Sequence, residues 1–321
     1  MFERIIVTLD GSASSETALP AAEELARRLG SSLVLLHVIE ARPPKAIHGE
    51  RHLATVIEAE GYLAPIVARI QAEGLHAVAH VHDSGAREPG DTRGVAASVA
   101  AHEAEFGNDL AVMAAHGKHG LSEALSGSLP LKVAASGGAA VLLVPRPVQS
   151  SALDRSGAAV VPAPTVFASR RLLVPLDGRS EHEAALPAAE ALASAFGLNL
   201  RLLAVVPRNA ADAGGPGTAF ALLAPALSGA SLEYAAEGEE RYLADIAGRL
   251  AAKGLKVDWR VIRGRPAKAI VAEAEEGDLI VLSSHRRIGL DASLDGCVAF
   301  GVAQAWQGAM LVVPVPKDHK P

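Results

Sequence analysis

The sequence predicts an α/β fold that occurs twice in one chain. The opening motif IIVTLDG at Ile5–Gly11 returns as LLVPLDG at Leu172–Gly178. The string ALPAAE follows both copies at one common offset, at Ala18–Glu23 and Ala185–Glu190. Later matches have slightly different offsets, which indicates shared elements joined by loops of different length. A repeat of this length is a whole domain, because the units of solenoid proteins span only about 20–50 residues.

Each half alternates short apolar runs with longer amphipathic ones. The short runs are rich in Val, Leu and Ile, which is typical of strands buried on both faces of a parallel sheet. Strands that alternate with helices predict a doubly wound sheet. The expected strands are Arg4–Leu9, Ser32–Ile39, Ala77–His82, Leu110–Ala114 and Ala140–Val144, then Arg171–Leu176, Asn199–Val206, Lys256–Ile262, Leu279–Ser283 and Ala309–Val313.

Helices are expected between these strands. In the first half they are Ser15–Leu29, about Arg51–Glu73, about Gly94–Glu105, and Ser128–Ser136. The predicted domains are residues 1–147 and 169–321, joined by a linker at 148–168 that is rich in Pro, Ser and Ala. Residues 83–93 and 207–229 are interpreted as long loops, either plain surface loops or lids and contact surfaces.

Composition narrows the class of protein. A chain of 321 residues suits about two domains, and a content of 50% hydrophobic but only 3% aromatic residues predicts aliphatic cores. The net charge of −6 is dispersed and does not suggest a nucleic-acid partner. Cys297 is the single cysteine, and no stretch reaches the roughly 18 apolar residues of a membrane span. We therefore expect a cytoplasmic protein without a membrane segment.

Three segments of the first half are expected to meet where ligands bind doubly wound sheets, beyond the carboxyl ends of the strands. They are Asp10–Ser12, His37–Ile39 and Met113–Ser128. Asp10 is of the type that accepts hydrogen bonds from ribose hydroxyls. The glycines and Ser128 of the third segment fit a phosphate loop at a helix N-terminus. They equally fit turns and a helix start with Ser128 as N-cap, so both interpretations stay open.

The third segment resembles the nucleotide signature of the universal stress protein family, Gly-x2-Gly-x9-Gly-(Ser/Thr). Ala114 occupies the first glycine position, and Thr8 stands where many members have proline. The resemblance implies Rossmann-like (adenine nucleotide alpha hydrolase-like) domains, each with a five-stranded parallel sheet of order 3-2-1-4-5. It also implies ATP, with or without Mg²⁺, as the ligand of the first domain. The positions that match the family's ATP site are Thr8, Asp10, Val38, Met113, Ala114, Gly117, Gly127, Ser128 and Leu129.

The second half departs from this signature. Asp177 keeps the turn after the first strand, but Arg286 stands at the position of Gly117, and Cys297 at that of Ser128. An arginine there either fills the space of a phosphate or binds an anion by itself. The sequence therefore predicts one ATP site per chain, in the first domain.

Histidines give a weaker signal. His80 and His82 share one face of a predicted strand and precede Asp83, while His48 and His52 are spaced by four residues. Either group could hold a metal ion. We expect polar residues at element ends instead, and no metal site.

The sequence contains no hydrolase, metalloprotease or P-loop motif. Together with the resemblance, this predicts a tandem universal stress protein that acts in the stress response by binding ATP and is not an enzyme. The last strands of the two domains, Ala140–Val144 and Ala309–Val313, are expected to pair within one chain, and a homodimer and an unknown protein partner are compatible with this. The alternatives are an interaction or chaperone-like module that binds no nucleotide, and a weak nucleotidase.

Overall fold

The computed structural model describes residues 1–39, 46–47, 50–51, 53–83, 92–107, 109–115, 129–136, 138–145, 166–167, 171–209, 212, 229–285 and 297–316. They form two compact units. One contains Phe2–Pro130 and Leu143–Val166, and the other contains Phe167–Pro321 with Met1 and Leu131–Leu142. Each unit is described by itself, and the domain limits at residues 147 and 169 stay a prediction.

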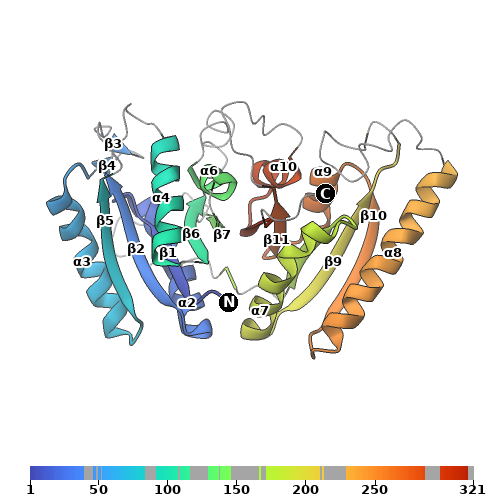
Figure 1. The fold of residues 1–321 in the computed structure, drawn as a ribbon, viewed down its shortest axis with the longest axis horizontal. Helices are drawn as coiled ribbons and strands as arrows, with labels where there is room; N and C mark the ends of the chain where they lie inside the picture. The colour runs from blue at the N-terminus through green and yellow to red at the C-terminus, as the bar shows by residue number, and fades with distance from the viewer. Residues whose placement is uncertain are drawn as a thin grey trace, which may run out of the picture. The chain divides into compact units, whose positions relative to one another are not determined.

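The first half forms a parallel sheet close to the expected strand limits (Figure 1). Its strand order is β5-β2-β1-β6-β7, which is the order that the family resemblance implies. Residue pairs such as Thr8↔Leu36 and Val7↔Val112 show that β1 runs parallel to β2 and to β6. The strands are β1 (Arg4–Thr8), β2 (Ser32–Ile39), β5 (Ala77–Asp83), β6 (Leu110–Ala115) and β7 (Ala140–Pro145).

The order reverses at β1. The chain passes from β1 to β2 and β5 on one side, and then returns to β6 on the other side of β1. Because loops diverge at such a reversal, the carboxyl ends of β1 and β6 border the crevice in which ligands of doubly wound sheets bind.

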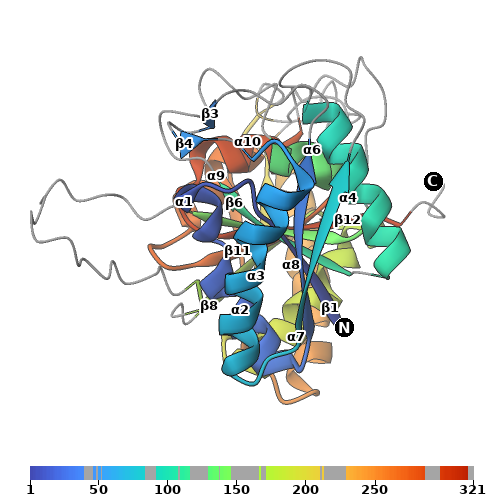
Figure 2. The same ribbon diagram turned by 90° about the vertical axis from the view of Figure 1, so that its left-hand side faces the viewer.

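Helices cover both faces of this sheet. α2 packs on β1 and β2, and α3 packs on β5 and β2. Figure 2 shows α3 and α4 on opposite sides of the strands, as right-handed crossovers in opposite directions require. The helices are α1 (Ala13–Glu16), α2 (Leu19–Leu29), α3 (Val56–Ala72), α4 (Thr92–Phe106) and α6 (Leu129–Ser136), and β3 (Ala46–Ile47) and β4 (Glu50–Arg51) form a short antiparallel pair.

The predicted continuous helix Ser15–Leu29 is wrong. The segment forms α1 and α2, which are separated at Thr17 and Ala18. Pro20 lies in the first turn of α2, where its missing N–H leaves no hydrogen bond unmade. Further into a helix, the same ring would break the backbone ladder.

The helix expected from Arg51 also begins later, at Val56. Thr55 is its N-cap, and the hydroxyl of Thr55 accepts a hydrogen bond from the backbone N of Glu58 at 3.2 Å. The Glu58 carboxylate in turn accepts from the backbone N of Ala54 at 3.0 Å. This reciprocal cap satisfies N–H groups that no helical carbonyl can reach.

The second half repeats the architecture with the order β10-β9-β8-β11-β12. A 3₁₀ helix, η1 (Ser180–Ala185), replaces α1, and Pro187 again lies in the first turn of the following helix. The strands are β8 (Arg171–Leu176), β9 (Asn199–Val206), β10 (Val257–Arg263), β11 (Leu279–Ser284) and β12 (Met310–Pro314). The helices are α7 (Leu186–Phe196), α8 (Gly229–Ala251), α9 (Pro266–Glu273) and α10 (Val298–Ala305).

The cores are aliphatic, as the composition predicts. Ile5, Ile6 and Val7 of β1 are fully buried, as are Leu172, Leu173 and Val174 of β8. β5 and β10, each at one end of the strand order of its half, differ from the expectation of strands buried on both faces. Val78 of β5 is 42% exposed, and Trp259 of β10 is 39% exposed.

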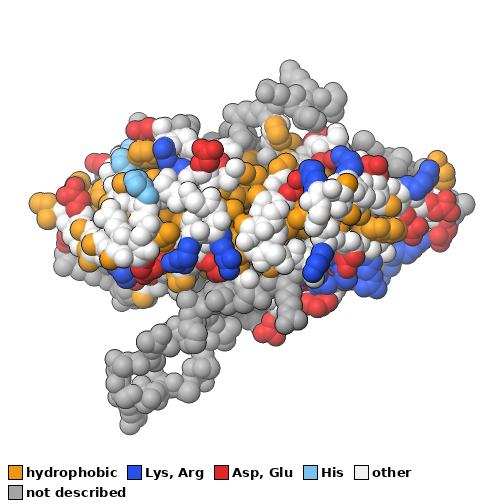
Figure 3. Space-filling view, turned by 90° about the horizontal axis from the view of Figure 1, so that it is seen from below, with side chains coloured by type: hydrophobic (Ala, Val, Ile, Leu, Met, Phe, Trp, Pro, Cys, Tyr) orange, Lys and Arg blue, Asp and Glu red, His pale blue; other side chains and the backbone are white. Residues whose placement is uncertain are grey.

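The surface of the described residues carries side chains of both charges. On the face drawn in Figure 3, acidic and basic side chains are interspersed with hydrophobic and histidine side chains. Among the described helices, none has both the length and the apolar character that a membrane crossing requires.

Candidate functional site

The turn after β1 holds an acidic side chain in a fixed orientation. Oδ1 of Asp10 accepts hydrogen bonds from the backbone N of Ser12 at 2.9 Å and from its Oγ at 2.6 Å. The backbone N of Asp10 donates to Oγ of Ser15 at 3.2 Å. Ser12 also caps α1, since its Oγ accepts from the backbone N of Ser15. The carboxylate is therefore held at the carboxyl end of β1, beside the reversal of strand order.

Gly11 is needed in this turn for two reasons. Its φ of +90° lies in the left-handed region, which side chains disfavour. A Cβ at Gly11 would also lie 2.8 Å from Cγ of Leu53. Leu53 thus packs directly over the turn.

The described members of the predicted ATP site lie at the carboxyl ends of neighbouring strands. Thr8 ends β1, Val38 lies in β2, and Met113 and Ala114 lie in β6. Met113 is buried, and the other three are partly accessible. Leu129 begins α6, whereas Gly117, Gly127 and Ser128 lie outside the described residues. The structure therefore describes the residues predicted to contact adenosine, but not the residues predicted to contact the phosphates.

Two further contacts support this edge of the sheet. Nδ1 of His37 donates to the carbonyl oxygen of Leu9 at 2.7 Å, since a carbonyl can only accept, and this links the ends of β2 and β1. The hydroxyl of Tyr62 donates to Oε1 of Glu16 at 3.0 Å. Burial and the nearby Glu16 carboxylate raise the pKa of Tyr62, so the hydroxyl keeps its proton. The string YLA occurs at Tyr62–Ala64 and again at Tyr242–Ala244, which is a sequence signal for Tyr62. Tyr242 makes the matching bond to Glu183 at 3.3 Å.

The corresponding turn of the second half is occupied by histidines. Nδ1 of His182 lies 2.6 Å from Oδ1 of Asp177, and its Nε2 lies 3.0 Å from Nε2 of His285. His182 stands at the repeat position of Ser15, whose side chain is much shorter. Ser283 donates from Oγ to the backbone oxygen of His182 at 3.0 Å and holds this segment against β11. Burial, followed by the neighbouring His182, lowers the pKa of His285.

A second carboxylate faces this turn. The side chain of Glu239 lies beside Gly178, where an added Cβ would be 3.0 Å from Oε1 of Glu239. Burial raises the pKa of Glu239 to about 7, and repulsion from Asp177 adds to the shift. The matching residue of the first half is Ala59, by the offset of the YLA repeat. Sequence reasoning missed Glu239, because its contact with the turn depends on how α8 packs.

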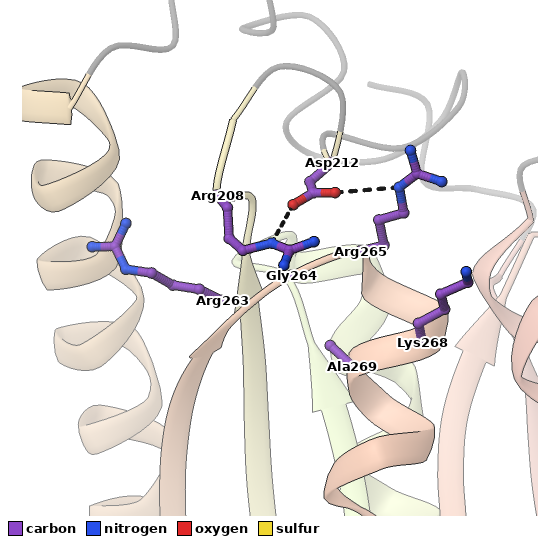
Figure 4. Close-up of a pocket in the computed structure, with 7 residues that line it drawn as sticks. All are labelled: Arg208, Asp212, Arg263, Gly264, Arg265, Lys268 and Ala269. Carbon is purple, nitrogen blue, oxygen red and sulfur yellow. Dashed lines mark hydrogen bonds and ion pairs between the residues drawn. The ribbon is translucent and has the colours of Figure 1, made fainter.

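A basic pocket lies beyond the carboxyl ends of β9 and β10 (Figure 4). Its volume is about 390 Å³, and its lining includes Arg208, Arg263, Arg265, Lys268 and Asp212. Asp212 is buried and accepts from Nε of Arg208 at 2.5 Å and from Nε of Arg265 at 3.2 Å. This carboxylate orients two guanidinium groups, so the pocket has the chemistry of a small-anion site. Sequence reasoning missed it as well.

The histidine pair of β5 gains a third member in the structure. His102 of α4 contacts both His80 and His82, with ring centroids at 4.7 Å and 4.4 Å. Burial, followed by the neighbouring His102, lowers the pKa values of His80 and His82. His48 and His52 lie outside the described residues.

A parallel sheet of this order that occurs twice in one chain, with an acidic turn at each reversal, defines a tandem Rossmann-like α/β protein. The model of the universal stress protein family matches residues 1–145 and 168–314. The chain therefore belongs to the universal stress protein family.

Solved structures share this fold over nearly the whole chain. A universal stress protein from Archaeoglobus fulgidus is 16% identical with a TM-score of 0.64, and the match covers 98% of this chain and 97% of that one. The functionally unknown protein PA1789 from Pseudomonas aeruginosa is 15% identical with a TM-score of 0.63, covering 98% and 93%. The cytoplasmic domain of a prokaryotic cation chloride cotransporter is 13% identical with a TM-score of 0.54, covering 97% and 95%. No curated protein matches the sequence.

Proposed function

We propose that this tandem universal stress protein binds ATP in its first domain and acts in the stress response through that binding rather than through catalysis. The second domain serves as a structural or interaction partner. In this proposal the last strands, Ala140–Val144 and Ala309–Val313, pair within the chain.

The contrast between Asp10 and Asp177 carries the proposal. Ser12 holds Asp10 from its own turn, through the backbone N and the hydroxyl. An imidazole lies against Asp177 instead, with Nδ1 of His182 at 2.6 Å. A ribose needs a carboxylate that can accept from its hydroxyls. The first turn offers that geometry, whereas in the second turn a ligand would have to displace His182.

The charge of the two turns also favours the first domain as the ATP site. ATP brings negative charge, and in the second domain the nearby Asp177 carboxylate helps to raise the pKa of Glu239. The first domain has Ala59 in place of Glu239. The phosphate contacts of Gly117, Gly127 and Ser128 rest on the family resemblance, and Mg²⁺ would accompany the phosphates.

One observation favours a second candidate, a nucleotide-free interaction module. Ala114 adds a methyl group at the position where the family signature has its first glycine. If that methyl blocks the ligand, the first domain has lost ATP as well, and Ala114→Gly should create binding that the natural chain lacks.

Calorimetric titration of the full chain with Mg-ATP tests the proposal. We expect one site per chain. Asp10→Asn should weaken binding about 10- to 100-fold, because it removes hydrogen bonds to a charged acceptor worth roughly 1.5–3 kcal/mol. Asp177→Asn is the matched control and should leave the affinity unchanged. Gly117→Arg, which copies Arg286 of the second domain, should abolish binding.

Three results would contradict the proposal. The absence of heat at millimolar ATP in the natural chain would leave the interaction module. Equal losses in Asp10→Asn and Asp177→Asn would place the site elsewhere or in both domains. Release of phosphate in proportion to bound nucleotide would instead indicate a weak nucleotidase.

A further inference from the structure

Three histidines converge at the outer edge of the first unit. His80 and His82 are two residues apart on β5, so their side chains share one face of the strand. α4 places His102 against that face, and His102 is only 3% exposed. Two neighbouring elements thus direct three imidazoles to one point.

The ring nitrogens face one another. Nε2 of His80 lies 2.8 Å from Nε2 of His102. One ligand atom from each of the three histidines lies within 4.8 Å of those from the other two. The hydrogen bond between His80 and His102 accounts for two of these nitrogens, and a ring nitrogen of His82 lies beside the same pair.

His102 is oriented by its other nitrogen. Nδ1 of His102 lies 2.7 Å from the backbone oxygen of Ser98, and it must donate because a carbonyl oxygen only accepts. A neutral His102 therefore presents the lone pair of Nε2 to His80 and His82. A carbonyl that fixes the tautomer in this way is the usual support of a metal-binding histidine.

We propose that His80, His82 and His102 form a binding site for a divalent transition metal, with Zn²⁺ as the ion that best suits three imidazoles. Zn–N bonds of 2.0–2.1 Å in a tetrahedron separate two ligand nitrogens by about 3.3 Å. The 2.8 Å between His80 and His102 then widens by roughly 0.5 Å, and His80 presents its lone pair in place of the Nε2 proton.

The surroundings suit such an ion. Oε2 of Glu105 lies 3.8 Å from Nε2 of His102 and belongs to an exposed side chain, so it or a water molecule can take the fourth position. The ring of Phe106 lies 4.9 Å from that of His80 and forms an apolar wall. An apolar wall strengthens the attraction between the ion and its ligands.

The second unit shows that the fold forms without histidines at the positions of His80 and His82. The repeat offset that aligns the two YLA strings places Arg260 and Ile262 at the positions of His80 and His82. Arg260 of β10 forms an ion pair with Glu273 of α9 at 3.0 Å. In the second unit an ion pair thus connects the strand and helix that correspond to β5 and α4. His82→Ile copies the second unit and is the matched variant for removing a ligand.

Titration of the metal-free full chain with Zn²⁺, and with Co²⁺ followed by its visible absorption, tests the proposal. We expect the natural chain to bind Co²⁺ with the intense absorption of a tetrahedral site. His82→Ile should weaken Zn²⁺ binding tenfold or more and abolish that absorption. The second unit contains another group, Glu181, His182 and His285, that could hold a metal ion. His182→Ala is therefore the control, and it should leave the absorption intact.

A thermal melt without metal checks the fold of each variant, and His80→Gln is a second ligand deletion of similar size. Zn²⁺ should raise the melting temperature of the natural chain and of His182→Ala, but not that of His82→Ile or His80→Gln. The proposal would be overturned if His82→Ile and His80→Gln bound Zn²⁺ and Co²⁺ as the natural chain does and showed the same rise in melting temperature. Loss of the absorption in His182→Ala alone would overturn it too.

Discussion

Glu239 illustrates how a single residue distinguishes the two turns. In the folded protein its pKa rises from 4.5 to about 7, so the folded state holds a proton that the unfolded chain has released. A raised pKa contributes stability below the unfolded value, and this contribution is lost as pH rises through the folded value. Between about pH 4.5 and 7, Glu239 therefore makes the protein progressively less stable.

Glu239→Gln should remove this dependence. At pH 8 we expect the variant to be more stable than the natural chain by about 1–2 kcal/mol, a figure already reduced because the side chain is partly exposed to solvent. At pH 5 the difference should shrink towards zero. Chemical denaturation at both pH values measures it. Glu240→Gln, at an exposed neighbour on α8, is the control, and the same pH trend in both variants would rule out Glu239 as the cause.

At the scale of residues, the sequence predicted candidate residues that belong to one motif. It did not predict residues that reach a site from a distant element of the chain. Asp10 and its turn followed from the repeat and the strand end. His102 lies 22 residues from His80, and only the docking of α4 on β5 brings them together. Periodicity predicts that a helix has a buried face, but it does not determine which strand residue meets which helix residue. The basic pocket was missed for the same reason.

At the scale of elements, strands were predicted to within about one residue, because an apolar run ends where the chain leaves the sheet. Helix starts were less accurate. Pro20 starts a new helix inside the segment Ser15–Leu29, which periodicity predicts as one helix. Pro187 lies in the first turn of α7 in the same way. The early start expected for α3 ignored the cap signal in Thr55 and Glu58, which was visible in the sequence.

This cap gives a prediction for α3. Thr55→Ala should destabilise the protein by about 1 kcal/mol, because the backbone N of Glu58 loses the acceptor that Thr55 provides. α3 buries Ala59, Leu63 and Ile70, so weakening its first turn loosens packing as well. Urea denaturation measures the change. Thr55→Ser keeps an acceptor and should cost much less, so equal losses in the two variants would argue against the cap.

At the scale of the whole molecule, the repeat predicted the architecture of both halves because each half carries the same succession of elements. It did not predict that the turns after β1 and β8 would diverge so far. The Tyr62–Glu16 bond recurs as Tyr242–Glu183, while Asp10 and Asp177 have different partners. The contact between the tyrosine and the glutamate is thus shared by the two halves, whereas the contacts of the aspartate in the turn are not.

The proposed pairing of the last strands within one chain has a consequence that can be measured. Backbone amides of Ala140–Val144 and Ala309–Val313 should exchange with deuterium at rates that do not depend on protein concentration. Pairing between chains would instead make protection fall on dilution, by mass action. Hydrogen exchange at high and low micromolar concentration, read by mass spectrometry, separates the two. Amides of β1 serve as the internal standard, and concentration-dependent protection of the last strands alone would exclude the intramolecular arrangement.

The outermost strands β5 and β10 differ in a way that matters when the protein is concentrated and stored. β10 carries Asp258, Arg260 and Arg263, whose charges resist the approach of another sheet. From Ala77 to His82, β5 has no acidic, lysine or arginine side chain, and Val78 is 42% exposed. No strand among the described residues pairs with the outer edge of β5, and an edge with so few charges is a template for pairing with a strand of another molecule. We therefore expect Val78→Lys to slow aggregation of the concentrated protein during storage, because it adds a charge to this strand.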